Sequence, residues 1–198
     1  MPTALHESAV SWMRKEFNLW MYYHLLTPTA VRTIMDALIT HDHFLGAFAD
    51  SSKTLDLAYS PCINGIRRAF PTVVLESGWS ESQAQLLCDR QLWQAGSAGA
   101  VKIVILFKMF APNMHDRIKA TLTFCRYVAG RVLVISSYPI FPLPVQPKSD
   151  PWITIDELFG GRTPNGRNPE TQLPLSMERL RIVVGAEIRQ QGHFPAVN

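Results

Sequence analysis

The sequence predicts a single α/β domain. Residues 72–76 form a β-branched run that ends in a glutamate, residues 80–95 carry apolar side chains at helical spacing, and residues 101–109 form a second apolar run. A strand, a helix and a second strand in this order indicate a parallel crossover unit of a sheet. The 198 residues are 47% hydrophobic and 18% charged, which suffices for one packed core and excludes an intrinsically disordered chain.

A helical arm over residues 1–43, made of two helices, is expected before this unit. The first helix covers residues 5–25, where an apolar stripe runs at steps of three and four. The members of this stripe are Val10, Met13, Phe17, Trp20 and His24. Trp12, Tyr22 and Tyr23 lie off the stripe, so a second side of the helix is apolar too.

The second helix is expected from Thr27-Pro28 to about residue 43, because threonine is a good N-cap and proline is accepted in the first turn. Residues 44–138 should form the core sheet and its crossover helix. Besides the crossover unit, the expected strands cover residues 44–49, 55–59, 119–127 and 131–138. Ser80 and Gln83 match a capping box at the start of the crossover helix. The apolar face expected for that helix consists of Ala84, Leu87, Cys88, Leu92 and Ala95.

The last part, residues 139–198, begins with a stiff proline-rich connector over 139–151. A short strand at 152–155 and a Gly/Pro/Asn-rich loop over 160–174 should follow it. Ser176 is the expected N-cap of a final helix. The whole chain, 1–198, is therefore interpreted as one domain.

Charge and cysteine content narrow the class of protein. Nineteen Lys and Arg against 16 Asp and Glu give a formal charge of +3, and the basic residues are scattered, whereas dedicated nucleic-acid-binding proteins carry a dense basic face. Three irregularly spaced cysteines predict neither a disulfide framework nor a zinc site. We expect no secretory signal and no membrane contact, and hence a cytoplasmic or nuclear protein.

Two acids are the candidate catalytic residues. Asp56 lies in the expected strand over 55–59, ahead of a turn at Pro61. Glu76 ends an otherwise apolar strand, where an ionised carboxylate is costly unless it is paired, hydrogen-bonded or bound to a metal. Two carboxylates from adjacent strand ends can hold one Mg²⁺ ion, which can activate a water molecule. The alternative is structural: Glu76 caps the helix that begins at Ser80, or pairs with an arginine.

A family resemblance rests on residues in and around these strands. They are Ser51, Ser52, Lys53 and Asp56, then Phe70, Pro71, Val74, Glu76, Gly78, Ser80, Glu81 and Ser82, and further on Leu87, Asp89, Trp93 and residues 101–105. This pattern resembles the restriction-endonuclease-like PD-(D/E)XK superfamily, and more narrowly a group of fungal proteins. The resemblance implies a mixed central sheet flanked by helices and Mg²⁺-dependent cleavage of phosphodiesters. It also implies that Asp56 and Glu76 are the metal ligands and that Glu7 is an accessory acid on a helix.

The sequence departs from this pattern at the lysine. The superfamily places this lysine two residues after the second acid, where this chain has Gly78. Some members carry the lysine on the next helix instead, but that position falls near Asp89, which has the opposite charge. Lys102 is expected to substitute if its side chain emerges beside Glu76, and Lys53 is the weaker candidate. The alternative function is accordingly a nuclease that acts on DNA or RNA with Asp56, Glu76, Lys102 and Mg²⁺.

The missing lysine, the low charge density and the aromatic content favour a different main hypothesis. It is a nuclease-like scaffold that has lost nuclease chemistry and binds or transforms a small apolar organic molecule, such as a cofactor-independent cyclase of fungal secondary metabolism. The expected substrate-binding residues are Tyr22, Tyr59, Trp79, Asp89 and Trp93.

A third hypothesis is a non-catalytic homodimeric interaction module. Its dimer face would consist of Trp12, Tyr22 and Tyr23 on the first helix, which requires these side chains to be exposed in the monomer.

Overall fold

A central sheet runs through the computed structural model, which describes residues 4–37, 40–63, 65–79, 83–128 and 131–198. Its strand order is β1-β4-β6-β7-β9-β10, with β5 paired to β4. In the described part β6 and β7 are parallel, and every other neighbouring pair of this sheet is antiparallel. The sheet strands are β1 (Ile34–Ala37), β4 (Leu57–Ile63), β5 (Ile66–Arg67), β6 (Val73–Gly78), β7 (Ile103–Met109), β9 (Ala120–Val128) and β10 (Arg131–Phe141). The protein is thus mixed α/β with a mostly antiparallel sheet, and the predicted crossover unit is confirmed.

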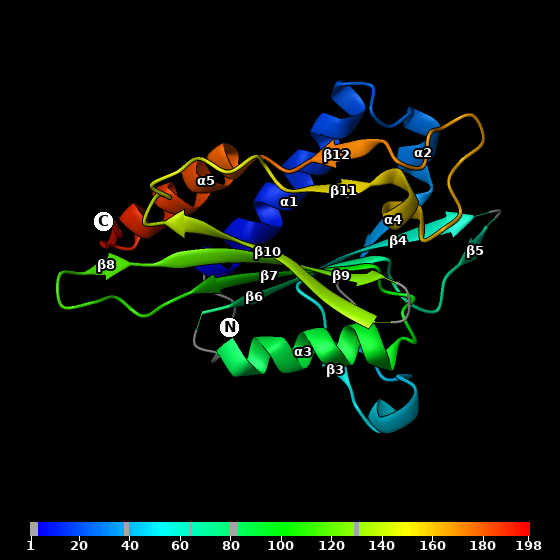
Figure 1. The fold of residues 1–198 in the computed structure, drawn as a ribbon, viewed down its shortest axis with the longest axis horizontal. Helices are drawn as coiled ribbons and strands as arrows, with labels where there is room; N and C mark the ends of the chain where they lie inside the picture. The colour runs from blue at the N-terminus through cyan, green and yellow to red at the C-terminus, as the bar shows by residue number, and fades with distance from the viewer. Residues whose placement is uncertain (1–3, 38–39, 64, 80–82, 129–130) are drawn as a thin grey trace.

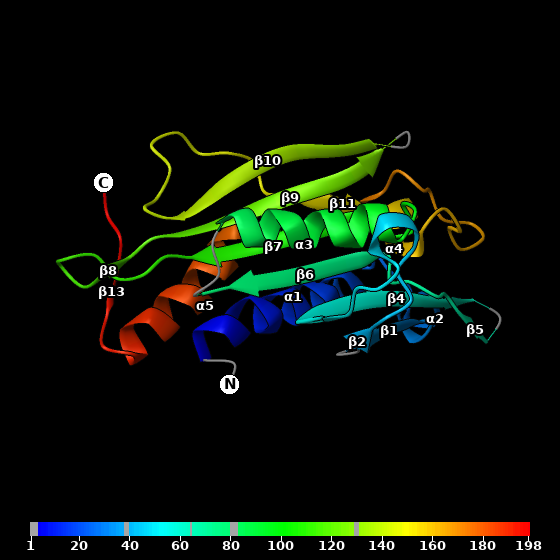
Figure 2. The ribbon, with the colours of Figure 1, turned by 90° about the horizontal axis from the view of Figure 1, so that it is seen from below.

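Helices cover both faces of the sheet, as Figure 1 and Figure 2 show. Helices α1 (Ala4–Tyr22) and α5 (Met177–Gln190) lie on one face, and α3 (Gln83–Gly96) lies on the other. The remaining elements are α2 (Pro28–Arg32), β2 (Thr40–His41), the 3₁₀ turn η1 (Gly46–Phe48), β3 (Lys53–Thr54), β8 (Arg117–Ile118), β11 (Trp152–Thr154), α4 (Ile155–Phe159), β12 (Gln172–Pro174) and β13 (Phe194–Pro195). Within the described ranges, no helix is long and apolar enough to cross a membrane.

Polar contacts hold α1 and α5 together on their face of the sheet. The side chain of Glu16 is fully buried, forms two hydrogen bonds with the Arg179 guanidinium at 2.6 Å, and accepts a bond from the Ser176 amide. The indole of Trp12, also fully buried, donates to the Ser176 carbonyl at 2.9 Å. Ser176 caps α5 as predicted, through its side-chain oxygen and the amide of Arg179.

The second predicted helix is too long. Helix α2 ends at Arg32, and residues 34–37 form strand β1 instead, so the boundary of the predicted helical arm at residue 43 is wrong. Strand β1 pairs with β4, where Ile34 lies opposite Pro61 and Met35 opposite Ser60. The apolar spacing over 31–38 suits a helix locally, but the ladder with β4 satisfies the same backbone groups and buries Ile34. The predicted strand over 44–49 is likewise replaced by a 3₁₀ turn.

Helix α3 also differs from expectation. Ser80, the predicted cap, lies outside the described residues. The predicted apolar face is confirmed at Leu92, which is buried, but it is wrong at Ala84, Cys88 and Ala95, which are exposed. The buried side chains on α3 include Leu86, Leu92 and Trp93, together with the polar residues Asp89 and Gln94. The spacing of apolar residues does not predict this buried face, because two of its members are polar side chains that hydrogen-bond to other residues.

Candidate functional site

Glu76 lies on the face of β6 that is covered by α3. It is 3% exposed, and its Oε1 accepts a 2.6 Å hydrogen bond from the indole nitrogen of Trp93 on α3. Strand side chains alternate between faces, and Val74 packs in the cluster beneath α3. The two-residue step from Val74 places Glu76 toward the same helix. Local strand geometry and one indole donor therefore fix the position of this carboxylate.

Asp56 directly precedes β4, in line with Glu76 on the neighbouring strand β6. Leu57 pairs with Leu75 in the antiparallel ladder, so the residue before Leu57 is in line with the residue after Leu75. The Oδ2 atom of Asp56 accepts a 2.6 Å hydrogen bond from the amide of Ser77, and its Oδ1 lies 2.8 Å from Nε2 of His6 on α1. The structure thus brings together the two acids that the sequence singles out.

A second charged pair borders the acids. Lys53 Nζ donates to Oδ2 of Asp89 at 2.7 Å, and the Asp89 side chain is nearly buried on α3. Gln85, one turn earlier on α3, donates to Oδ1 of Asp89 at 3.4 Å. Asp89 is therefore part of the site, but as the partner of a lysine.

The surroundings of Glu76 favour its neutral form. Burial raises the pKa of this carboxyl group to about 8, and the negative charges of Asp56 and Asp89 act in the same direction. The positive charge of Lys53 and the hydrogen bond from Trp93 lower the pKa of Glu76 only in part. A cation bound at Glu76 would compete with the proton that this raised pKa favours.

The space above Gly78 is filled by a neighbouring side chain. A Cβ atom at Gly78 would lie 3.0 Å from Cδ1 of Leu86 on α3, so a longer side chain there requires Leu86 to move. Lys108 lies directly beside Gly78 in the parallel β6–β7 pair, just as Leu106 lies beside Glu76. Leu106 packs beneath α3, so the two-residue step also directs Lys108 to the face of Glu76.

Lys108 is almost buried, and its Nζ donates to the Trp79 carbonyl at 3.2 Å. By standard sheet spacings, its Cα is about 8 Å from that of Glu76. Sequence reasoning missed this residue, although a signal existed. Parallel neighbouring strands end at the same edge of a sheet, so the lysine near the end of the second strand belongs beside the glutamate near the end of the first.

Lys102 lies at the other end of β7. Its backbone amide donates to Thr72 and its Nζ donates to the carbonyl of Gly99 at 2.8 Å. Leu106 is the cross-strand neighbour of Glu76, and Lys102 lies four residues before Leu106. Four residues of strand put the Cα atoms of Lys102 and Leu106 about 13 Å apart. The condition on which Lys102 was expected to serve, a side chain beside Glu76, is not met.

Of the predicted substrate-binding aromatic residues, Trp93 reaches the acids. Trp79 is half-buried against the core between the sheet and the α1–α5 face. Tyr59 lies in that same core, where its hydroxyl donates to Met13 and its ring stacks on Phe17. Burial raises the pKa of Tyr59 well above its usual range. Tyr22, at the end of α1, is 73% exposed.

Asp56 and Glu76 are the side chains of this site that could hold a magnesium ion. Mg²⁺ is usually held by one or two carboxylates and keeps several water ligands, which the pair Asp56 and Glu76 supplies. Within the described residues, no group of three or more His, Cys, Asp and Glu side chains is arranged to hold a metal ion. Water and substrate oxygens would therefore complete the coordination.

Comparisons of the chain with protein-family models, with curated proteins and with solved structures give no match. The functional assignment consequently rests on the geometry described above.

Proposed function

We propose that this protein is a metal-dependent phosphodiesterase on a restriction-endonuclease-like scaffold. The observation that carries the proposal is the position of Lys108, beside Gly78 and on the face of Glu76. Two acids and a lysine then share one edge of the sheet. The order of elements supports the same scaffold: helix α1, the antiparallel strands β1, β4 and β6, the crossover helix α3, and the parallel strand β7.

The residues have separate tasks in hydrolysis of a phosphodiester, in which water adds to phosphorus and one P–O bond breaks. A Mg²⁺ ion, when bound, supplies an activated water and offsets charge on the phosphate. Asp56 and Glu76 would hold the ion, and His6 and Trp93 orient these two side chains through their hydrogen bonds. Lys108 supplies a fixed positive charge where the phosphoryl oxygens gain negative charge.

Two lysines on one strand provide a matched test. Single- and double-stranded DNA and RNA are incubated with the protein and Mg²⁺ or Mn²⁺, and initial cleavage rates are measured. Lys108→Ala should lower the rate by about 100-fold, the usual cost of losing one preorganised charge-stabilising group, whereas Lys102→Ala should stay within about twofold. Equal losses in both variants, or no cleavage above that of Glu76→Ala, would overturn the proposal.

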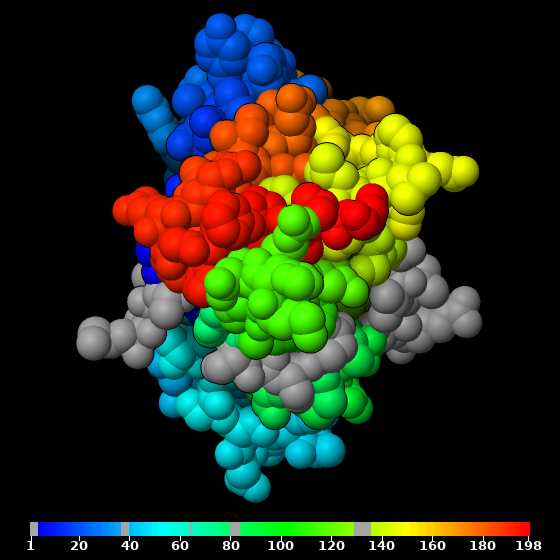
Figure 3. Space-filling model, turned by 90° about the vertical axis from the view of Figure 1, so that its left-hand side faces the viewer, coloured from blue at the N-terminus to red at the C-terminus, as the bar shows by residue number. Residues whose placement is uncertain are grey.

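Binding of a small apolar organic molecule without a cofactor is the second candidate function. A cavity of about 740 Å³ near the C-terminus favours it, because Phe141, Leu143, Phe194 and Val197 form much of its lining. Figure 3 faces this side, where the C-terminal segment in red lies against the green segment before β9 and the yellow segment after β10. The aromatic residues first assigned to substrate binding are absent from this lining. Leu143→Arg should abolish binding of an apolar fluorescent probe here, and unchanged binding would exclude the cavity.

The homodimer remains a further proposal. Tyr22 and Tyr23 are exposed, as a contact face requires. Their rings pack edge to face, with 5.3 Å between the ring centroids. Trp12 is fully buried and cannot take part in it. Light scattering of Tyr22→Ser/Tyr23→Ser beside the wild type tests the proposal, and an equal mass for both would reject this face.

A further inference from the structure

An aromatic ring lies beyond Lys108 on the same face of the sheet. The backbone amide of Phe110 donates to the carbonyl of Lys119 at 2.9 Å, which continues the β7–β9 ladder one residue past the Met109–Ala120 pair. Strand side chains alternate between faces, so the two-residue step from Lys108 directs Phe110 to the face of Lys108. Figure 3 looks at this end of the sheet, where the green segment before β9 projects. The Phe110 ring therefore lies next to the proposed catalytic edge.

Two ammonium groups lie close to this ring. Nζ of Lys108 and Nζ of Lys119 are each 5.4 Å from the centroid of the Phe110 ring, within the range of a cation–π contact. Lys108 is almost buried, whereas Phe110 is half-buried and Lys119 is exposed. The ring thus combines a partly accessible aromatic surface with positive charge, and one of the two cations is a long side chain in solvent that can change its partner.

This combination suits a nucleotide. Proteins that bind single-stranded nucleic acids stack the bases on aromatic rings and contact the backbone with basic side chains. A cation–π contact at an exposed position is weaker than the stacking of a base on a ring, so a base can replace Lys119 at Phe110. Two residues of strand put the Cα atoms of Lys108 and Phe110 about 7 Å apart. A base on Phe110 therefore brings an adjoining phosphate within reach of Lys108.

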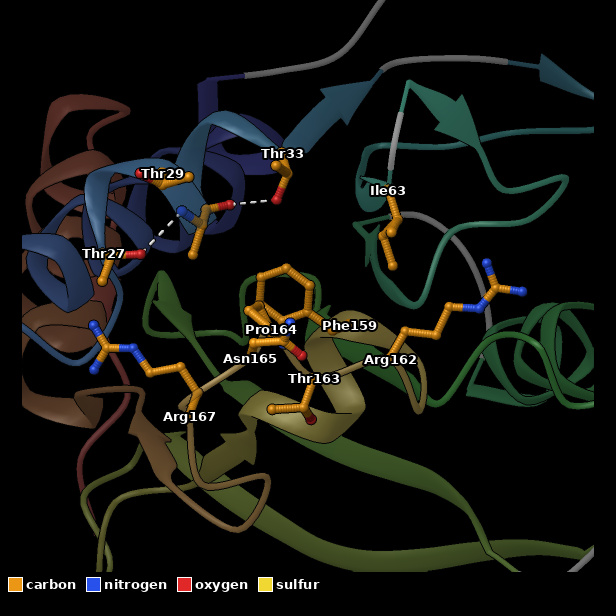
Figure 4. Close-up of a pocket in the computed structure, with 11 residues that line it drawn as sticks. Thr27, Thr29, Thr33, Ile63, Phe159, Arg162, Thr163, Pro164, Asn165 and Arg167 are labelled. Carbon is orange, nitrogen blue, oxygen red and sulfur yellow. Dashed lines mark hydrogen bonds between the residues drawn. The ribbon is translucent and has the colours of Figure 1, made fainter.

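A polar cavity of about 620 Å³ between α2 and the loop after α4 lacks this combination. Figure 4 shows Arg162 and Arg167 on opposite sides of this cavity with their guanidinium groups pointing apart, so one phosphate cannot contact both. The aromatic residue in its lining, Phe159, is 1% exposed and offers almost no surface for stacking. A nucleotide is therefore better accommodated at Phe110.

We infer that Phe110 stacks on an unpaired base next to the phosphate that is cleaved, so that the substrate is a single-stranded nucleic acid. Lys119 contacts the backbone of the strand, and Lys108 keeps its place beside the acids. In a duplex each base is stacked between neighbouring base pairs, which leaves no face open to Phe110. This inference rests on the proposed phosphodiesterase activity and names the substrate class of the same site.

The test is binding of fluorescein-labelled strands to the full chain, measured by anisotropy in EDTA, where metal-dependent cleavage is blocked. The probes are an oligothymidylate of about 12 nucleotides, a length within the usual site size of single-strand-binding proteins, the same strand in a duplex, and an abasic strand with the same number of phosphates. The single strand with bases should bind more tightly than the abasic strand, because only its bases can stack. Equal affinities of these two strands would overturn the inference.

Substitutions of the ring decide whether Phe110 is the stacking residue. Phe110→Leu keeps an apolar side chain and should weaken binding of the oligothymidylate about tenfold, while the duplex and the abasic strand should bind as before. Phe110→Tyr keeps the ring and should stay within about twofold of the wild type. Tyr22→Leu removes a ring that is 73% exposed on α1 and should have no effect. Unchanged oligothymidylate binding in Phe110→Leu, or an equal loss with all three probes, would overturn the inference.

The charge of Lys119 is tested through the salt dependence of binding. Lys119→Gln should lower the slope of log K against log salt by about 0.7, the contribution of one phosphate contact in a single strand. Arg167→Gln removes a charge at the cavity of Figure 4 and should leave the slope unchanged. A lower slope in Arg167→Gln alone would overturn the inference. Binding that depends on Phe110 without any cleavage in Mg²⁺ would overturn the proposed activity and support the single-strand site.

Discussion

Lys108 and Gly78 are direct neighbours across the parallel β6–β7 pair. The side chain of Leu86 occupies the space above Gly78, while the neighbouring strand carries a positive charge on the same face of the sheet. Glu76 and Lys108 thus come from two neighbouring strands, β6 and β7.

Enlarging Gly78 should destabilise the fold. Gly78→Val places methyl groups against Leu86, whose nearest carbon is 3.0 Å from the Cβ position, and overpacking of this kind costs about 1–3 kcal/mol. Urea unfolding measures the loss. The same substitution in a Leu86→Ala background should cost clearly less, and an equal cost in both backgrounds would show that Leu86 is not the obstacle.

The stability of the protein should depend on pH through Glu76. Its pKa in the folded state is about 8, above the ordinary 4.5 of an unfolded chain. The unfolded state therefore loses its proton first, and the contribution of Glu76 to the free energy of unfolding, complete below about pH 4.5, declines until about pH 8. Glu76→Gln should remove this decline and be more stable than the wild type at pH 8–9. Urea unfolding curves in EDTA at pH 5, 7 and 9 measure it; parallel profiles would contradict the prediction.

Removal of Arg179 should be costly. Arg179→Met leaves the fully buried carboxylate of Glu16 without its cation, and breaking a buried pair in this way typically costs about 3–5 kcal/mol. Arg14→Met is the matched control, because Arg14 and Asp36 are 46% and 54% exposed, and exposed pairs contribute about 0–1 kcal/mol. Thermal unfolding of both variants tests the contrast, which similar melting temperatures would refute.

Magnesium should stabilise the wild type through the two acids. A ligand that binds only the folded state at 100 times its Kd adds about 2.7 kcal/mol to the free energy of unfolding. Asp56→Asn and Glu76→Gln should both lose the rise in Tm that Mg²⁺ produces, and EDTA should reverse it in the wild type. A rise that persists in both variants would assign the ion to another site.

Local sequence patterns were sufficient for several elements. The β-branched run of β6 and the Ser176 cap of α5 are each determined by interactions between near neighbours. The same patterns failed at residues 34–37, because the backbone partner that makes β1 a strand is 27 to 21 residues further along the chain, at Pro61 to Ala58.

Residue types and chain order thus determined that Asp56 and Glu76 are unusual, since a carboxylate beside an apolar strand needs a partner. Tertiary structure decided what the partners are. His6, Lys53 and Trp93 reach the two acids and their neighbour Asp89 from α1, β3 and α3, and no spacing in the sequence encodes these contacts. The choice of Lys108 over Lys102 also required the register of β6 against β7, because register decides which of two residues on one strand faces a given neighbour.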